Sequence, residues 1–427
     1  MVRASSRKMI YPSASVPATV SRARHCICFA PHALTALGNV APVVALAQLV
    51  SDPAIVGEAG DSSSFAMLFN GVAALANALG KVLTAPLVDA AGAPYLIAAI
   101  LAMAVSLAAF ALAPSEVALL ACWASCNICL SGSWAAESKA IEATYHRERW
   151  PIAFGLLTNT SLLIRIGARV GLGALLSAVS WRVMCISVAL TLGAAVFIIV
   201  PLFAAGQLKS GRTQRNGGPC SPSGVELCLD PPIVLYAVAM AGATCVQRME
   251  NLVAVVLVQC AHLSASDAAM QSALFHVAVF ATISIVTPFY SGLGVRSKAV
   301  LMIGLNALGC ACIVCLVHLT SASSQALHNS RAWYALALNG LLAAAGSCFA
   351  LLYYVSVSVF SLSHGDASAR VLALLNAAGQ AGGFLFQVGA AYLFSIGYGW
   401  SEVLGGLAGC ATLATLCTAL AEMSAER

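Results

Sequence analysis

The sequence predicts an all-α polytopic membrane protein with twelve transmembrane helices in two pseudo-symmetric six-helix bundles. Two observations on composition and one on pattern predict this class. Of the 427 residues, 60% are apolar and only 9% are Asp, Glu, Lys or Arg, whereas a soluble domain has about 25% charged residues. The mean hydropathy is +0.89. The apolar residues form runs of about 20, the length that crosses a bilayer as a helix.

Polar residues between the apolar runs set the limits of the predicted spans. Connectors such as 89–93 are short, which favours helical hairpins, because lipid-exposed backbone outside a helix would lose its hydrogen bonds. The spans are expected near residues 29–50, 64–88, 94–114, 116–136, 151–178, 181–203, 232–259, 266–289, 299–320, 331–358, 369–393 and 400–421.

The longest interior break, 204–231, divides the chain into six spans and six. It is rich in Gly, Pro and basic residues, the composition of a flexible linker. Arg149 and Trp181 flank the fifth span, and Arg370 and Trp400 stand at equivalent places in the second half. This echo indicates two repeats. The predicted organisation is a basic tail or targeting segment at 1–28, an N-terminal bundle at 29–203, a cytoplasmic linker at 204–231, a C-terminal bundle at 232–421 and a C-terminal tail at 422–427.

The distribution of the 21 Lys and Arg residues predicts the orientation. Fifteen fall on the side of the termini, two (Arg182 and Arg331) on the other side, and four inside spans. Since Lys and Arg in short loops stay on the cytoplasmic side, both termini are expected there. Residues 1–25 carry five basic residues, five Ser and no acid. This fits a targeting peptide as well as a cytoplasmic tail, so a plasma membrane and an organelle membrane both stay open.

Ionisable side chains inside spans are costly and usually face a protein interior or a water-filled cavity. Spans 3, 6, 9 and 12 carry no interior charge. Arg165 lies about 21 Å along the fifth span, near the middle of the bilayer, and Arg169 follows one turn later on the same face. The candidate solute-binding residues are Lys81, Arg165, Arg169, Arg248, Asn77, Asn251 and Gln380.

These charges favour one class of solute. The four intramembrane cations against Glu250 leave a formal charge of +3, with Glu137 as a further offset nearer the cytosol. Such a cavity favours an anion, and guanidinium groups suit carboxylate or phosphate oxygens. A structural interpretation stays open, because long cations also snorkel or pair with acids. Glu250 and His276 are the candidates for proton coupling.

The segment between the second and third spans resembles a loop signature of the major facilitator superfamily. The signature is Gly-x-x-x-Asp-x-x-Gly followed by basic residues; Asp89 and Gly92 match it, and Ala85 stands at its first Gly. With the twelve spans and the central break, the resemblance covers nearly the whole chain. It implies a transporter in which every third helix packs outside the substrate path. It also implies that Asp89 and Gly92 act in gating, where a carboxylate meets the N-terminus of a helix.

The Gly80-Lys81 pair ahead of this loop is similar to the organophosphate:phosphate antiporter branch of the superfamily. That branch uses basic residues of both halves to hold a phosphate, which implies such a role for Lys81 and Arg248. The branch also implies an Arg in the first span, and none stands there.

The predicted function is secondary active transport of a small anionic solute, an organic phosphate or carboxylate, by alternating access between the two bundles. Two alternatives stay open: a proton-coupled transporter of a neutral or cationic solute, and a transport-inactive receptor or scaffold. The sequence has no phosphate-binding loop, HExxH motif or nucleophile elbow, so no enzyme activity, cofactor or metal site is expected. The formal charge of +5 is too diluted for a nucleic-acid surface. The expected partners are the solute and the lipid bilayer, and a monomer is expected.

Overall fold

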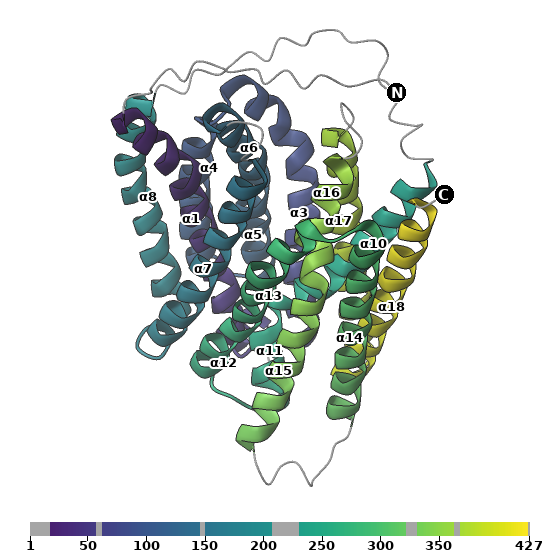
Figure 1. Cartoon of the computed structure of the whole chain (residues 1–427). Coiled ribbons are helices and arrows are strands. Elements are labelled where there is room, and N and C mark those ends of the chain that lie inside the picture. Colours follow the sequence, from purple (N-terminus) through teal and green to yellow (C-terminus); the bar gives the residue numbers. More distant parts are fainter. Residues whose placement is uncertain are drawn as a thin grey trace, which may run out of the picture.

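The computed structural model describes residues 18–56, 62–145, 150–206, 230–321, 331–362 and 368–425. The regular elements in these ranges are helices, and most of the long ones run along one common direction (Figure 1). The predicted basic segment as far as residue 17 and the predicted linker from 207 to 229 lie outside the described residues.

The helices before the linker form the first half of the molecule, and those after it form the second half. The first half contains α1 (Ala18–Leu49), α2 (Pro53–Val56), α3 (Ser62–Ala91), α4 (Tyr95–Leu112), α5 (Glu116–Ser131), α6 (Ser133–Thr144), α7 (Trp150–Leu176) and α8 (Trp181–Gly206). The second half contains α10 (Pro231–Arg248), η2 (Met249–Asn251), α11 (Val253–Ala261), α12 (Ala265–Gln271), α13 (Ala273–Gly292), α14 (Val295–Ser321), α15 (Arg331–Ala350), η4 (Leu351–Ser356), α16 (Val357–Leu362), α17 (Ser368–Ser395) and α18 (Trp400–Ala425).

Eleven segments within the described residues are long and apolar enough to cross a membrane. They correspond to eleven of the twelve predicted spans. The exception is α7, which has 27 residues but carries Arg165, Arg169 and a polar run at 158–161. The chain is therefore a multi-pass membrane protein, and the count of twelve, which includes α7, stays a prediction.

The helices pair in the same way in both halves. In the first half, α1 packs against α7 and α8, α4 against α5 and α8, and α3 against α5. In the second half, α10 packs against α17 and α18, α14 against α15 and α18, and α13 against α15. These pairs are equivalent when the helices are counted by predicted span, as a duplicated six-helix unit predicts.

The halves are joined mainly where α3 packs against α17 and where α7 packs against α12 and α13, and α1 also contacts α11 and α12. At Gly173 of α7, an added Cβ would lie 2.9 Å from the backbone nitrogen of Met270 in α12. A glycine is therefore needed for this close approach of the helices. Below, the near side is the side where α1 begins and α18 ends, and the far side is where α1 ends and α18 begins (Figure 1).

Local signals set the ends of several helices. Ser115 Oγ accepts a hydrogen bond from the Ala118 N–H at the start of α5, as an N-cap residue does. Gly92 follows the end of α3 with a φ of 62°, and its N–H donates to the Val88 C=O at 2.8 Å. This left-handed conformation favours glycine. The backbone at this position therefore explains why a glycine stands at Gly92 of the loop signature.

Two predicted spans are interrupted. The span predicted at 232–259 is divided into α10 and α11 by the 3₁₀ turn η2, and the span predicted at 331–358 contains the π-helical turn η4. Neither turn contains Gly or Pro, so the sequence pattern does not reveal them. Single π-helical turns inside α-helices often occur at functional sites.

The helices of spans 3, 6, 9 and 12, which are α4, α8, α14 and α18, expose large apolar side chains. Val105, Phe197, Val300 and Leu416 are examples, each more than half exposed. Such surfaces suit contact with lipid rather than water.

Candidate functional site

A cavity of about 260 Å³ has walls from both halves. They come from α1, α3, α5, α6 and α7 of the first half and from α10, η2, η4 and α17 of the second, whereas α4, α8, α14 and α18 contribute none. The polar and ionisable residues of the walls are His32, Thr35, Asn39, Asn77, Lys81, Asn127, Ser131, Ser133, Glu137, Ser161, Arg165, Gln247, Arg248, Glu250, Asn251, Tyr353, Tyr354 and Gln380.

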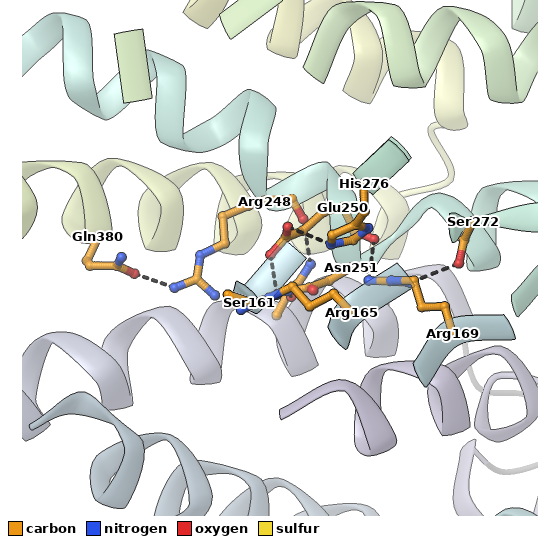
Figure 2. Close-up of polar contacts among 10 residues, drawn as sticks. Ser161, Arg165, Arg169, Arg248, Glu250, Asn251, Ser272, His276 and Gln380 are labelled. Carbon is orange, nitrogen blue, oxygen red and sulfur yellow. Dashed lines mark hydrogen bonds and ion pairs between the residues drawn. The ribbon is translucent and has the colours of Figure 1, made fainter. Parts of the chain in front are cut away.

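Glu250 of η2 is the centre of an ion-pair cluster between the halves (Figure 2). Arg165 Nη1 of α7 donates to Glu250 Oε1 at 3.0 Å, and His276 Nε2 of α13 lies 3.1 Å from Glu250 Oε2. The His276 side chain is fully buried, while those of Arg165 and Glu250 are 21% and 16% exposed. Arg165 therefore has a carboxylate partner in the opposite half.

Arg169 lies one turn farther along α7, fully buried and outside the cavity wall. Its Nη1 donates to Ser272 Oγ and its Nη2 donates to the backbone C=O of Glu250, both at 2.9 Å (Figure 2). Arg169 thus ties α7 to η2 and to the junction of α12 and α13.

At the interruption η2, backbone carbonyls of the second half accept hydrogen bonds from side chains of the first half. The Glu250 C=O accepts from Arg169, and the Arg248 C=O accepts from Asn70 Nδ2 of α3 at 3.4 Å. Asn251 Nδ2 in turn donates to Asn70 Oδ1 at 2.9 Å. Carbonyls freed at membrane depth need such partners. Both α3 and α7 therefore bind the same interruption in the second half.

Arg248, the last residue of α10, has different surroundings. Its Nη2 donates to Gln380 Oε1 of α17 (Figure 2), and among the described residues no carboxylate lies at ion-pair distance from it. Lys81 of α3 lines the same cavity and likewise forms no ion pair within the described part of the chain. Among the described residues, the wall thus contains two cations with no acid at ion-pair distance.

A second ionisable pair, His32 and Glu137, lies toward the near side. His32 is the sixth residue of the candidate span Ile27–Leu49, and Glu137 is four residues before the end of the span Glu116–Ile141. His32 Nδ1 lies 2.8 Å from Glu137 Oε2. Glu137 is fully buried, and its Oε1 has no hydrogen-bond partner among the described residues.

On the far side, a cluster of four residues joins the halves. Gln259 of α11 accepts hydrogen bonds from Ser63 Oγ at 2.9 Å and from Trp400 Nε1 at 2.8 Å. Its Nε2 donates to Ser62 Oγ at 2.9 Å. We call Ser62, Ser63, Gln259 and Trp400 the far-side clasp.

The other hydrogen bonds between the halves also avoid the near side. Within the described residues, those made by α3 use Ser62 to Asn70, and those made by α7 use Arg165 to Gly173. Since α3 begins and α7 ends on the far side, the described hydrogen bonds hold the halves together at mid-depth and on the far side.

The structure places most of the predicted site residues in one cavity. Arg169 and His276 lie behind Glu250 instead of in the wall. Asp89 lies near the end of α3 with its side chain outside the described part of the chain, and Gly92 follows that helix. The predicted residues found in the wall are Asn77, Lys81, Arg165, Arg248, Glu250, Asn251 and Gln380.

Sequence reasoning did not name Tyr353, Tyr354 and His32 of the wall, and it did not predict the contacts of Gln259 and Glu137. Tyr353 and Tyr354 enter it from η4, and their only sequence signal is a pair of polar-tipped aromatics inside an apolar run. Gln259 has a signal as well, since it is a polar residue near the end of a predicted span. His32 and Glu137 are ionisable residues inside or beside spans, but nothing in the sequence indicates that they meet.

Comparison with curated proteins finds none that matches this chain. The family model described as Major Facilitator Superfamily matches residues 32–387, most of the chain. The match runs from His32 to Gln387 and so contains every charged residue of the cavity wall. The chain belongs to the Major Facilitator Superfamily and is a multi-pass membrane transporter.

Proposed function

We propose that this transporter moves a small solute by alternating access and binds an anionic group of that solute, a carboxylate or a phosphate, at Arg248 and Lys81. The observation that carries the proposal is that these two cations line the cavity without an ion-paired acid among the described residues. Both side chains are partly buried, a partly buried charge without an ionic partner is costly, and an anionic ligand offsets that cost. Arg165 contributes less to binding of the anionic group, because Glu250 already neutralises its charge.

The two cations come from opposite halves, Lys81 from α3 and Arg248 from α10. Gln380 orients one side of the Arg248 guanidinium, and a guanidinium can bind a second, planar anion in a bidentate manner. An anion between Lys81 and Arg248 reduces the repulsion between them. It also forms a solute-dependent contact between the halves, which a ligand needs in order to shift a conformational equilibrium.

The test is uptake into proteoliposomes containing the purified transporter. The panel contains phosphate esters, carboxylates, sugars and amino acids, and we expect uptake of a solute that bears an anionic group. Arg248→Gln should abolish this uptake and Arg248→Lys should retain part of it. Arg182→Gln is the matched control, because Arg182 bonds the carbonyls of Ala111 and Ala113 outside the cavity. Uptake of neutral or cationic solutes only would contradict the proposal, and no uptake at all would favour the receptor or scaffold alternative.

A second candidate function is proton-coupled transport of a neutral or cationic solute. The contact between His276 Nε2 and Glu250 Oε2 at 3.1 Å favours it, because both groups can exchange a proton. In that case His276→Gln should remove the stimulation of uptake by a pH gradient, while exchange of solute at equal pH persists. Under the first proposal without proton coupling, a pH gradient has no effect on the wild type.

We further propose that the near side faces the cytosol, as the distribution of Lys and Arg predicts, and that the transporter works as a monomer. Labelling of a C-terminal tag before and after permeabilisation tests the orientation. The membrane in which the transporter resides follows from localisation of the tagged full-length chain.

A further inference from the structure

We infer that the solute carries a cationic group as well as the anionic one, and that Glu137 recognises the cationic group. The inference rests on the proposed function, because Arg248 and Lys81 supply the binding of the anionic end. It extends the proposal from an anionic group to a small zwitterionic solute.

Glu137 is an acid with unused acceptor capacity in the cavity wall. Its side chain is fully buried, and among the described residues its only ionic neighbour is His32, whose Nδ1 lies 2.8 Å from Oε2. Oε1 has no hydrogen-bond partner in the described part of the chain. A buried carboxylate is costly unless its oxygens receive hydrogen bonds. A donor group on a solute would supply them.

The cations of the cavity do not fill this role. Arg248 and Lys81 line the same cavity as Glu137, yet neither lies at ion-pair distance from it. The other acid of the wall, Glu250, already has Arg165 and His276 as partners. Beside the Arg165–Glu250 pair, the cavity therefore presents Glu137 on one hand and Arg248 and Lys81 on the other without an ion pair between them, an arrangement complementary to a solute with two opposite charges.

Trp134 adds a second observation that points to a cation. It lines the cavity one turn before Glu137 in α6, and its side chain is 40% exposed. An indole face attracts an ammonium or guanidinium group. A carboxylate together with an indole is thus a suitable site for an organic cation, and the cavity volume of about 260 Å³ requires the solute to be small.

The experiment measures ligand binding to the purified full-length transporter by thermal shift in detergent. The probes are three matched ladders, each a series of compounds of increasing chain length: ω-amino carboxylates, plain carboxylates and plain alkyl amines. A parallel set contains ω-aminoalkyl phosphates and alkyl phosphates. The ladder tests all charge separations that the cavity allows. At the best length we expect the probe with both charges to bind about tenfold or more tightly than the plain anion.

Glu137→Gln should erase that preference, and binding of the plain anion at wild-type affinity or tighter, since a like charge is removed from the cavity, shows that the variant is folded. Glu137→Asp, which keeps the charge, should retain part of the preference. Glu116→Gln is the control, because Glu116 lies at the start of α5 outside the cavity wall. If Glu137→Gln does not fold, the comparison of the ladders on the wild type and on Glu137→Asp decides.

Equal binding of plain anions and doubly charged probes at every length in the wild type would overturn the inference and leave the proposed function standing. So would a Glu137→Gln variant whose binding changes only in its pH dependence, because Glu137 would then hold a proton and no solute group. Amines that bind as tightly as the doubly charged probes, or a panel in which no probe binds, would overturn the proposed function together with the inference.

Discussion

Arg165 and Arg248 lie in the wall of the same cavity, but their surroundings differ. Arg165 donates to the carboxylate of Glu250 across the interface between the halves. Arg248 donates to the neutral amide oxygen of Gln380 in its own half, and no acid of the described residues is paired with it. A cation with a buried carboxylate partner contributes to the structure, whereas one held by a neutral amide keeps its charge for a ligand.

This contrast separates two kinds of mutational effect. Changes at Arg248 and Lys81 should alter solute binding and leave the folded state intact. Changes at Glu250, Arg165 and the far-side clasp should alter the stability of the protein or the balance of its conformations.

The largest effect is expected for Arg248→Gln. Loss of the charged contact should reduce uptake of the anionic solute by about 100-fold or more. The Tm should stay the same or rise, because Lys81 lies close enough to Arg248 for their charges to repel. Uptake in proteoliposomes and the Tm in detergent are measured on the same preparation. A variant with wild-type uptake would show that Arg248 is not in the binding site.

Glu250→Gln should act mainly on stability. It leaves Arg165 without its carboxylate, and the free energy of unfolding should fall by roughly 2–3 kcal/mol, below the value for a fully buried pair because Arg165 is 21% exposed. The measurement is the Tm in detergent, where a decrease of several degrees is expected. Glu116→Gln serves as the control and should leave the Tm unchanged.

Lys81→Gln should weaken solute binding less than Arg248→Gln. The Lys81 ammonium is a point charge on a flexible chain and does not form a bidentate contact, so KM should rise about tenfold. Lys81→Arg should retain most of the affinity. A Lys81→Gln variant with an unchanged KM but a lower Tm would show that Lys81 stabilises the fold, as Arg165 does, and does not bind the solute.

The smallest effect is expected at the far-side clasp. Gln259→Ala removes two hydrogen bonds between the halves, one from Ser63 and one to Ser62, and a bond from Trp400 within the second half. The two bonds between the halves are only partly buried, so each is worth about 0.5 kcal/mol. The population open on the far side should rise several-fold, because the bonds that keep that side closed are lost. Trp400 fluorescence should shift to longer wavelength as its indole meets water. An unchanged spectrum would show that the clasp does not close this side.

Much of the fold could be predicted from the sequence, because contact with lipid imposes a local requirement on composition. Apolar runs mark the spans, and the absence of interior charge in spans 3, 6, 9 and 12 agrees with a cavity wall to which α4, α8, α14 and α18 contribute nothing. The glycine at position 92 also has a local cause, because its φ of 62° lies in the left-handed region that favours glycine.

The pairing of the charges could not be predicted in the same way. Arg165 and Glu250 are 85 residues apart, and they meet only because α7 packs beside η2. Arg169 is satisfied by Ser272 and by a backbone C=O, and a carbonyl freed at η2 has no signature in a sequence without Gly or Pro at that point. A formal charge of +3 therefore does not reveal which cation has no acid at ion-pair distance.

The central claim is that Arg165 serves the structure and Arg248 serves the solute. It is tested most directly by the Tm of Arg165→Gln and Arg248→Gln, measured with and without the anionic probe that stabilises the wild type most. We predict a lower Tm for Arg165→Gln with the ligand-induced shift retained, and a wild-type or higher Tm for Arg248→Gln with the shift lost. The reverse pattern, a lost shift in Arg165→Gln and a retained one in Arg248→Gln, would contradict the account.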